Sequence, residues 1–336
     1  MAGVKTAVVL FNLGGPDSPE AVEPFLFNLF SDPAIIGVPQ PIRWLIAKLI
    51  SKRRAPVARK IYARIGGRSP LLAETVAQAR ALEAMLGTDW RCFIAMRYWH
   101  PLTEEAVWAV KHWGADRVIL LPLYPQFSTT TSGSSIKAWT EAARQSGLEL
   151  PTQVACCYPE QDGLVAAMAE LARSGHEAAA HSGRPRVLFS AHGLPKKVIE
   201  RGDPYQRQVE RTAAAVAAAT GIPLLDWVVC YQSRVGPLEW IGPSIEKELE
   251  RAGRDGVPVV VVPVAFVSEH SETLVELDIE YRQRAVEMGV PAYVRVPAVG
   301  CHSSFIAGLA EVARSSGGGG GRMCRTLGCG CPVEPG

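Results

Sequence analysis

The chain has 336 residues, of which 48% are hydrophobic and 20% are charged, a composition typical of globular proteins with a sizeable core. A net charge of +2 argues against a protein that holds nucleic acid through bulk positive charge and leaves only a local basic patch open. The longest apolar run, residues 257–267, contains two prolines and is shorter than the roughly 20 residues of a spanning helix. The first residues show no signal-peptide cleavage site, and eight cysteines do not make a disulfide scaffold. We therefore expect a cytoplasmic protein.

Strand-like runs alternate with helical segments along most of the chain. The runs are rich in β-branched and aromatic residues and bounded by turn residues; they span residues 6–11, 92–96, 117–121, 186–189, 227–230 and 258–262. Helical spacing of apolar residues is clearest in residues 72–85, 103–113, 134–145, 205–219 and 269–286. This alternation predicts an α/β fold with parallel sheets that carry helices on both faces.

The alternation occurs twice, and each half opens on a strand that runs into a polar turn, at residues 10–16 and 188–195. We therefore predict two Rossmann-like domains, residues 1–150 and 151–301. A helix over about residues 302–314 completes the first domain, and residues 315–336 form a flexible Gly- and Cys-rich tail. Ligands bind beyond the carboxyl ends of parallel strands, and clefts between domains are favoured pockets, so we expect both turns at one cleft.

His192 is the first candidate for chemistry, because it lies in the turn that opens the second half. The neighbouring Gly193 permits close approach to a ligand. An imidazole can take up a proton near neutral pH or bind a metal ion. The alternative is a core histidine bonded to a backbone carbonyl, and the position at a strand end favours the functional interpretation.

Four glutamates near residue 270 form the second candidate. If Ser268 caps a helix, spacings of three, four and four place them on one face, opposite Leu274, Leu277 and Tyr281; the glutamates are Glu269, Glu272, Glu276 and Glu280. Clustered carboxylates raise one another's pKa and can pass protons or a hydrated cation. A solvated acidic stripe is the alternative, but the helix follows the most apolar strand, which favours a position at the cleft.

Three further segments carry weaker signals. Residues 97–101 and 230–240 place aromatic and cationic side chains at strand ends, where they can stack on a flat ligand and pair with carboxylates, or simply pack. Residues 25–52 hold many apolar side chains, with Lys48, Lys52, Arg53 and Arg54 interleaved or following. They predict either a buried helix pair, or an interfacial helix or lip for an apolar, anionic ligand.

The cysteines divide into two groups. Cys324, Cys329 and Cys331 lie in the tail and offer three thiolates, whereas an iron–sulfur cluster usually takes four. Their spacing does not fit a zinc site. The other five are expected to be small buried hydrophobic residues; they are Cys92, Cys156, Cys157, Cys230 and Cys301.

Seven motifs, in this order over about residues 5–312, resemble the ferrochelatases, which insert ferrous iron into protoporphyrin IX in the last step of haem synthesis. The motifs span residues 12–16, 64–70, 97–105, 124–128, 190–195, 230–234 and 269–274. The resemblance implies a lyase with two chelatase-type domains and an apolar porphyrin lip over about residues 20–70. It implies protoporphyrin IX and ferrous iron as substrates.

The resemblance also implies roles for particular residues. His192 and Glu272 match a metal-binding catalytic pair that faces across the porphyrin plane. His270 and Glu276 match a polar and acidic path, as does Glu269, which stands where an aspartate is common. Matches to residues near the porphyrin are Leu13, Arg54, Ser69, Arg97, Tyr98 and Trp240.

The turn at residues 12–16 resembles the branch of the family that uses protoporphyrin rather than the one that uses coproporphyrin, which typically has a tyrosine there. Some members hold a [2Fe–2S] cluster on three tail cysteines and a fourth in the loop after Tyr-Pro-Gln. Here Thr129 occupies that loop position, so a cluster on Cys324, Cys329 and Cys331 would need another ligand.

Other functions stay open at this stage. A chelatase for cobalt or nickel would have the same fold, and a non-catalytic haem or porphyrin carrier would need the aromatic pocket but not the carboxylates. A nucleotide site is disfavoured because the first turn lacks G-x-G-x-x-G. The sequence also leaves open a monomer or homodimer, and a peripheral contact between the lip and the inner membrane.

Overall fold

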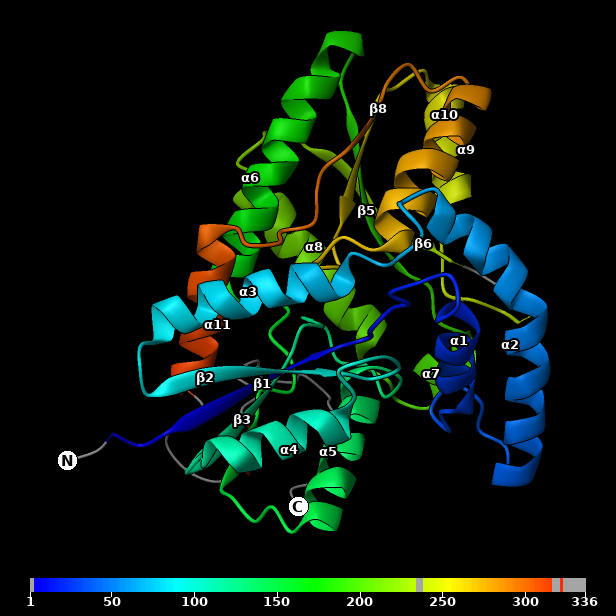
Figure 1. The fold of residues 1–336 in the computed structure, drawn as a ribbon. Coiled ribbons are helices and arrows are strands. Elements are labelled where there is room, and N and C mark those ends of the chain that lie inside the picture. Colours follow the sequence, from blue (N-terminus) through cyan, green and yellow to red (C-terminus); the bar gives the residue numbers. More distant parts are fainter. Residues whose placement is uncertain (1–2, 234–237, 316–320, 323–336) are drawn as a thin grey trace. The chain divides into compact units, whose positions relative to one another are not determined.

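The structure, a computed structural model, describes residues 3–233, 238–315 and 321–322 (Figure 1). The described chain forms two compact units. The first contains residues 3–157, 309–315 and 321–322, and the second contains residues 158–308. The second boundary falls inside α11 (Ser303–Ser315). Whether residues 1–150 and 151–301 fold as independent domains stays a prediction.

The first unit is built on a parallel sheet with the strand order β2-β1-β3-β4-β9. Its strands are β1 (Thr6–Asn12), β2 (Trp90–Met96), β3 (Arg117–Pro122), β4 (Thr152–Val154) and β9 (Gly321–Arg322). Every residue of β1 is buried, as a central parallel strand requires. Figure 1 shows α3 (Leu71–Leu86) on one face of the sheet, with α4 (Thr103–Trp113) and α5 (Ser132–Ser146) on the other.

Residues 25–52 belong to two helices, α1 (Val22–Ser31) and α2 (Gln40–Ala63). A proline in the first turn of α2 is well placed there, because its missing N–H would have no partner in the helix. The two helices pack through a buried cluster of Val22, Phe25, Leu26, Ala55, Tyr62 and Tyr98. Much of α2 is nevertheless exposed, including Leu45 and Leu49.

The second unit repeats this plan with the strand order β6-β5-β7-β8. Its strands are β5 (Arg186–His192), β6 (Asp226–Gln232), β7 (Val259–Pro263) and β8 (Tyr293–Arg295). Its helices are α6 (Asp162–Ala179), η1 (Ala180–Ser182), α7 (Lys196–Glu200), α8 (Tyr205–Ala219), α9 (Ile245–Asp255), η2 (Glu272–Tyr281) and α10 (Arg282–Glu287). Figure 1 shows α6 and α8 on one side of the sheet, and α9 and α10 on the other.

The α/β fold with two parallel sheets is confirmed, and each of the six predicted strands is present. Sequence analysis missed the short strands β4, β8 and β9, and β9 lies within the segment predicted as a flexible tail. The helix expected over residues 269–286 is wrong in detail, because η2 is a π-helix that begins at Glu272 and continues into α10. Ser268 therefore does not cap it, and Ser271 is the residue that precedes its first turn. Among the described residues, we find no helix with the length and apolarity to cross a membrane.

Candidate functional site

His192 and Glu272 form a direct pair in the second unit. His192 is the last residue of β5, and its Nδ1 lies 2.8 Å from Oε2 of Glu272, the first residue of η2. The side chains are 38% and 26% exposed, so both can be reached from solvent. That they face one another across a bound macrocycle stays a prediction of the resemblance.

Glu276 joins the pair through Ser233. The Ser233 backbone N–H donates to Oε1 of Glu276 over 2.8 Å, and its hydroxyl donates to Oε2 of Glu276. The same hydroxyl lies 3.4 Å from Oε2 of Glu272. Ser233 adopts a φ of +60°, which turns the chain back toward η2. The result is a continuous polar chain of His192, Glu272, Ser233 and Glu276.

In this polar chain, burial and the neighbouring charges shift the pKa values of the side chains in different directions. Burial alone would lower the pKa of His192, but the charge and hydrogen bond of Glu272 outweigh it and leave that pKa raised. Burial would raise the pKa of Glu272, yet His192 and then His270 hold it well below its usual value. For Glu276, burial and the charge of Glu272 raise the pKa despite the Ser233 hydrogen bonds. Glu272 is therefore the anion of the pair, and Glu276 is the carboxyl that protonates more readily.

His270 is a more deeply buried neighbour of the pair. Its ring is 11% exposed, and its Nε2 lies 3.9 Å from Oε2 of Glu272. The Phe266 ring packs against it with centroids 4.6 Å apart, and Nδ1 is buried without a hydrogen-bond partner in the described structure. A buried nitrogen without a partner is costly, which is typical of a group kept for chemistry or for an absent ligand.

Glu269 does not belong to this cluster, contrary to expectation. Its carboxylate accepts hydrogen bonds from Arg295 Nη1 at 2.6 Å, from the Ala298 N–H at 3.0 Å and from the Thr273 hydroxyl at 2.5 Å. Arg295 also pairs with Asp278. The charge of Glu269 is thus balanced by Arg295 inside the fold, and Glu280 is exposed. Of the predicted stripe of four glutamates, only Glu272 and Glu276 belong to the cluster.

Tyr281 packs in the buried core with Leu277, as expected, but the contact of its hydroxyl was missed because η2 is not an α-helix. The hydroxyl lies 3.1 Å from Oε1 of Glu276. A π-helix has i→i+5 hydrogen bonds, so residues five apart come onto one side. The sequence does not show that this segment is a π-helix, because the same spacing of acids also fits an α-helix.

In the first unit, four predicted residues come together at the turn of residues 12–16: Leu13, Ser69, Arg97 and Tyr98. Leu13 accepts a backbone hydrogen bond from Tyr98, and the Ser69 N–H donates to Pro16. A Cβ on Gly15 would lie 2.5 Å from the Ser69 side chain, so only glycine permits this approach. The Arg97 N–H donates a hydrogen bond to the Asn12 carbonyl, so Arg97 lies beside the same turn.

Asp32 organises this region and was not predicted. Its carboxylate accepts from Arg97 Nη2 at 2.9 Å, from the Tyr98 hydroxyl at 2.8 Å and from the Ser134 hydroxyl. Tyr98 is only 1% exposed, so its burial does not support a direct contact with substrate. The Arg97 side chain is 23% exposed and is held in place by this network.

The remaining predicted side chains lie apart from those networks. Arg54 is exposed on α2, with its guanidinium 5.8 Å from the centre of the Phe30 ring. Trp240 is partly buried beside the turn that follows His192, because Pro195 and Trp240 form a β-bridge. Its indole N–H is buried and has no hydrogen-bond partner in the described part of the chain.

The cysteine expectations are met in part. Cys156, Cys157 and Cys230 are buried, Cys92 is half-buried, and Cys301 is exposed, which contradicts the expectation for that residue. The tail residues Cys324, Cys329 and Cys331 lie outside the described residues. Within the described ranges, no three or more His, Cys, Asp or Glu side chains form a group suited to hold a metal ion.

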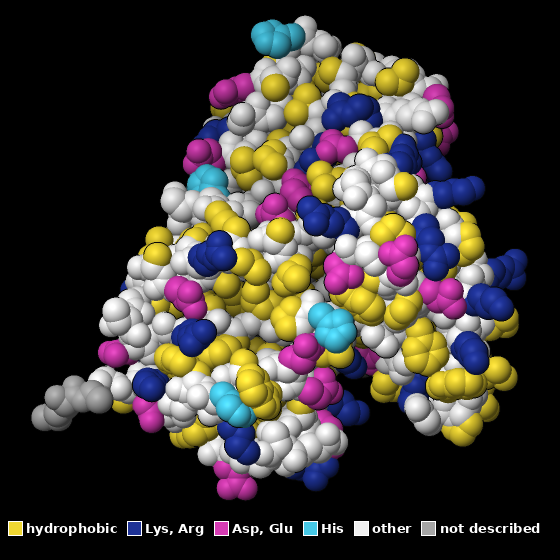
Figure 2. All heavy atoms as spheres, viewed as in Figure 1, with side chains coloured by type: hydrophobic (Ala, Val, Ile, Leu, Met, Phe, Trp, Pro, Cys, Tyr) yellow, Lys and Arg dark blue, Asp and Glu magenta, His cyan; other side chains and the backbone are white. Residues whose placement is uncertain are grey.

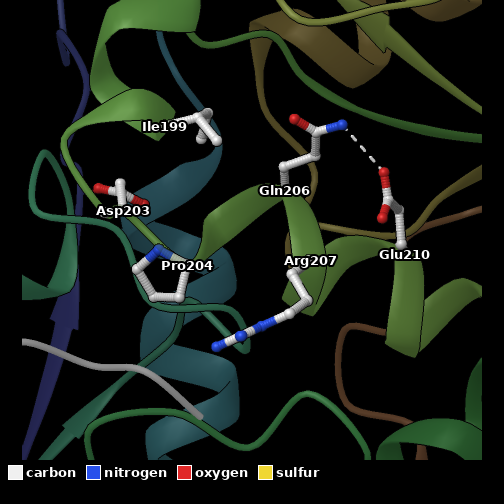
Figure 3. Close-up of a pocket in the computed structure, with 7 residues that line it drawn as sticks. Ile199, Asp203, Pro204, Gln206, Arg207 and Glu210 are labelled. Carbon is white, nitrogen blue, oxygen red and sulfur yellow. Dashed lines mark hydrogen bonds between the residues drawn. The ribbon is translucent and has the colours of Figure 1, made fainter. Parts of the chain in front are cut away.

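A surface pocket of about 420 Å³ lies where α7 is followed by α8 (Figure 3). It is lined by Ile199, Gly202, Asp203, Pro204, Gln206, Arg207 and Glu210. Gln206 and Glu210 hydrogen-bond to each other across one turn of α8. None of the predicted site residues lines this pocket, so we do not assign the function to it.

The fold is that of the chelatases. SirB from Bacillus subtilis, solved with Fe3+, aligns with a TM-score of 0.55 and 13% identity over 93% of this chain and 96% of its own. The sirohydrochlorin chelatase SirB from Bacillus subtilis subspecies spizizenii, solved with cobalt, gives the same TM-score and identity over 93% and 95% of the two chains. At this identity the likeness concerns the fold alone.

The chain belongs to the ferrochelatase family, whose sequence model matches residues 5–316. It is 58% identical to the ferrochelatase of Caulobacter vibrioides over 94% of this chain and 91% of that protein. The ferrochelatase of Phenylobacterium zucineum is 55% identical over 92% and 91%, and that of Hyphomonas neptunium is 50% identical over 98% and 95%.

Proposed function

We propose that this protein is a protoporphyrin ferrochelatase, a lyase that inserts ferrous iron into protoporphyrin IX and releases protohaem. The observation that supports it most directly is the hydrogen-bonded pair of His192 and Glu272, joined to Glu276, in a chain of this family. Metal insertion removes two pyrrole protons and strips water from the ion. A base and neighbouring carboxylates address both needs.

His192 is the proposed acceptor of pyrrole protons. Its Nδ1 is engaged with Glu272, which leaves Nε2 as the basic nitrogen. Glu272 stays ionised and stabilises the imidazolium as it forms, as a carboxylate beside a catalytic histidine does. Both His192 and Glu272 also offer ligands that suit ferrous iron only transiently during insertion.

Porphyrin binding is the proposed task of Leu13, Ser69, Arg97, Arg54 and Trp240. Arg97 is oriented by Asp32 and Ser134 and can pair with a propionate, whereas Tyr98 supports Asp32 from within the fold. The partly buried Trp240 offers an aromatic face for stacking on the macrocycle. The resemblance of the turn at residues 12–16 to the protoporphyrin branch favours that substrate over coproporphyrin.

An anaerobic assay of His192→Ala with ferrous iron and protoporphyrin IX tests the proposed site. We expect kcat to fall by about 100-fold or more while the Kd for porphyrin, measured by fluorescence, changes by less than about threefold. His181→Ala is the matched control, because His181 is an exposed histidine of the same unit in η1. A fully active His192→Ala protein would refute the assignment.

Two alternatives are separated by related measurements. A porphyrin carrier predicts that Glu272→Gln leaves any slow metal insertion unchanged, whereas a ferrochelatase loses rate. A cobalt or nickel chelatase predicts that these ions outcompete ferrous iron in kcat/KM when all three are supplied anaerobically.

We extend the proposal to a peripheral contact with the inner membrane through α2. Figure 2 shows hydrophobic and basic side chains close together over this helix. Leu45 and Leu49 are 62% and 68% exposed, Trp44 is 46% exposed, and Lys48 lies 4.8 Å from the Trp44 ring centre. Exposed apolar side chains beside basic ones suit contact with an anionic lipid surface. Vesicles with anionic lipid should retain the wild-type protein, and a Leu45→Ser, Leu49→Ser double variant should bind them less.

Iron is the substrate in this proposal. A [2Fe–2S] cluster on Cys324, Cys329 and Cys331 stays a prediction of the sequence, and the visible spectrum of the full-length protein purified without oxygen tests it. Whether the enzyme is a monomer or a homodimer is measured on the same sample by light scattering.

A further inference from the structure

The polar chain that begins at His192 does not end at Glu276. Beyond Glu276 lies the hydroxyl of Tyr281, 3.1 Å from Glu276 Oε1. The same hydroxyl lies 3.1 Å from Oε1 of Glu246, which belongs to the first turn of α9. The proposed mechanism uses neither Tyr281 nor Glu246, yet their hydrogen bonds continue the chain from the site.

The proton count at Tyr281 shows what kind of link this is. A phenol carries one proton, so it can donate fully to only one of the two carboxylate oxygens at 3.1 Å. The second contact is favourable only when its carboxyl is protonated and donates to the phenol oxygen. Burial and the charge of Glu272 raise the pKa of Glu276, which favours that state. The Glu276–Tyr281–Glu246 group therefore has the arrangement of a shared-proton chain.

The chain leads from the buried interior to solvent. Tyr281 is 4% exposed, whereas the Glu246 side chain is 34% exposed. Arg284, itself 51% exposed, lies 3.5 Å from Glu246 at the same surface. A proton that reaches Glu246 can pass to water.

The spacing suits protons rather than metal ions. Hydrated divalent ions hold oxygen ligands at about 2.1 Å and keep several waters around them. The Tyr281 oxygen already lies within hydrogen-bond distance of Glu276 and of Glu246, which leaves no space for an ion between them. A neutral phenol is also a poor ligand for such an ion. Iron passing this point would have to displace the phenol.

We infer that Tyr281 and Glu246 form a proton exit, through which protons taken from the porphyrin leave the site toward the surface of α9. In each transfer, protonated Glu276 gives its proton to the Tyr281 oxygen while the Tyr281 O–H proton moves to Glu246. Tyr281 ends neutral, Glu276 ends ionised, and Glu246 releases the proton to water. The inference rests on the proposed ferrochelatase function. It adds Tyr281 and Glu246 to the residues that act in it, and it gives the direction in which protons leave.

Tyr281→Phe in the full chain tests the exit by single-turnover insertion of ferrous iron into protoporphyrin IX. We expect the rate constant to fall about tenfold or more, with the KM for porphyrin and for iron changed by less than about twofold. Tyr293→Phe is the matched control, because the Tyr293 hydroxyl is also buried and donates to η2, at the Leu277 carbonyl, but does not touch the chain of acids. It should retain the wild-type rate if it folds equally well.

Glu246→Gln is the second variant, at a half-exposed position where folding is not at risk. We expect its rate to fall about threefold to tenfold and to recover as the concentration of a small non-chelating buffer is raised, because buffer can reach this partly exposed position and take up the proton that Glu246 no longer accepts. Glu250→Gln, an exposed residue of the same helix, should show neither effect.

The outcomes separate the two proposals. A wild-type protein without insertion activity would refute the proposed function itself. An active wild type, with Tyr281→Phe equal to Tyr293→Phe and Glu246→Gln insensitive to buffer, would overturn the proton exit alone. A rise in the KM for iron in place of a lower rate constant would also overturn it, because the path would then carry the metal.

Discussion

Arg295 is the buried cation on which the start of η2 depends. Its side chain is 8% exposed and pairs with Glu269 just before η2 and with Asp278 inside it. Through these two ion pairs, Arg295 at the end of β8 contacts both the segment just before η2 and the helix itself. Removing one member of a buried ion pair leaves the remaining charge without compensation, which costs far more than losing an exposed pair.

Arg295→Met should therefore lower the free energy of unfolding by about 3 to 5 kcal/mol, measured by urea denaturation. The exposed pair of Arg144 and Glu141 supplies the comparison, and Arg144→Met should leave the free energy of unfolding close to that of the wild type. Equal losses in the two variants would contradict the structural role of Arg295.

The His192–Glu272 pair gives stability a defined pH window. The raised pKa of His192 stabilises the fold fully below its unfolded value of about 6.5, and this contribution is lost as pH rises through the folded pKa. The lowered pKa of Glu272 stabilises the fold above its unfolded value of about 4.5, and this contribution is lost as pH falls through the folded pKa. Both contributions are present together between roughly pH 4.5 and 6.5.

In that window, His192→Gln should lower Tm by about 2 to 4 °C, because a partly exposed pair contributes about 1 kcal/mol. The difference from wild type should shrink toward pH 9. Thermal unfolding of the metal-free proteins at several pH values measures it, and a constant difference from pH 5 to 9 would show that the ion pair is not its cause.

At the scale of elements, α6 lies against the sheet of the second unit through a glycine. A Cβ on Gly175 would lie 2.4 Å from Val296 Cγ1 and 2.8 Å from Val260 Cγ1. These valines lie in β7 and just after β8, where little room exists to move. The absent side chain is therefore what allows the helix to approach this closely.

Gly175→Ala should destabilise the protein by about 1 to 3 kcal/mol through overpacking, even though alanine favours helices. Ser174→Ala, at the exposed neighbouring position of α6, should be neutral or slightly stabilising. Urea unfolding of the two variants decides the point, and a stabilised Gly175→Ala protein would mean that the helix can shift outward at little cost.

The sequence was informative where one physical signal dominates. Apolar runs found β1, β3, β5 and β7 because central parallel strands are buried on both faces. The three residues of β8 carry too short a signal, so Arg295 was missed with them. Asp32 was missed for another reason: its partners Arg97 and Ser134 are distant in sequence, and only folding brings them together.

The site shows the same limit. The sequence named His192, Glu272 and Glu276, and the resemblance to a family gave them roles. It placed Glu269 wrongly and missed the contact of the Tyr281 hydroxyl with Glu276, because the spacing of acids cannot distinguish an α-helix from a π-helix. Ser233, which joins two carboxylates, had no pattern of its own, since a serine after a strand is common in any fold.

At the scale of the whole molecule, the choice of porphyrin is open to a direct test. Coproporphyrin carries four carboxylates, whereas protoporphyrin carries two carboxylates and two vinyl groups. A site made for the second would leave two extra carboxylates without partners, at a cost of about 1 to 3 kcal/mol. We expect kcat/KM to be at least about tenfold higher with protoporphyrin IX than with coproporphyrin III, measured anaerobically with the same iron. Equal values would contradict the assignment to the protoporphyrin branch.

The two sheets correspond residue by residue at their centres. Thr6 pairs with Trp90 and Arg117 in one, as Arg186 pairs with Asp226 and Val259 in the other. Counting along β1 and β5, Asn12 occupies the position of His192. The two sheets therefore repeat one plan with different chemistry at the same position: the Asn12 amide bonds Thr75 and the Leu13 N–H of its own turn, whereas the His192 imidazole can carry a proton.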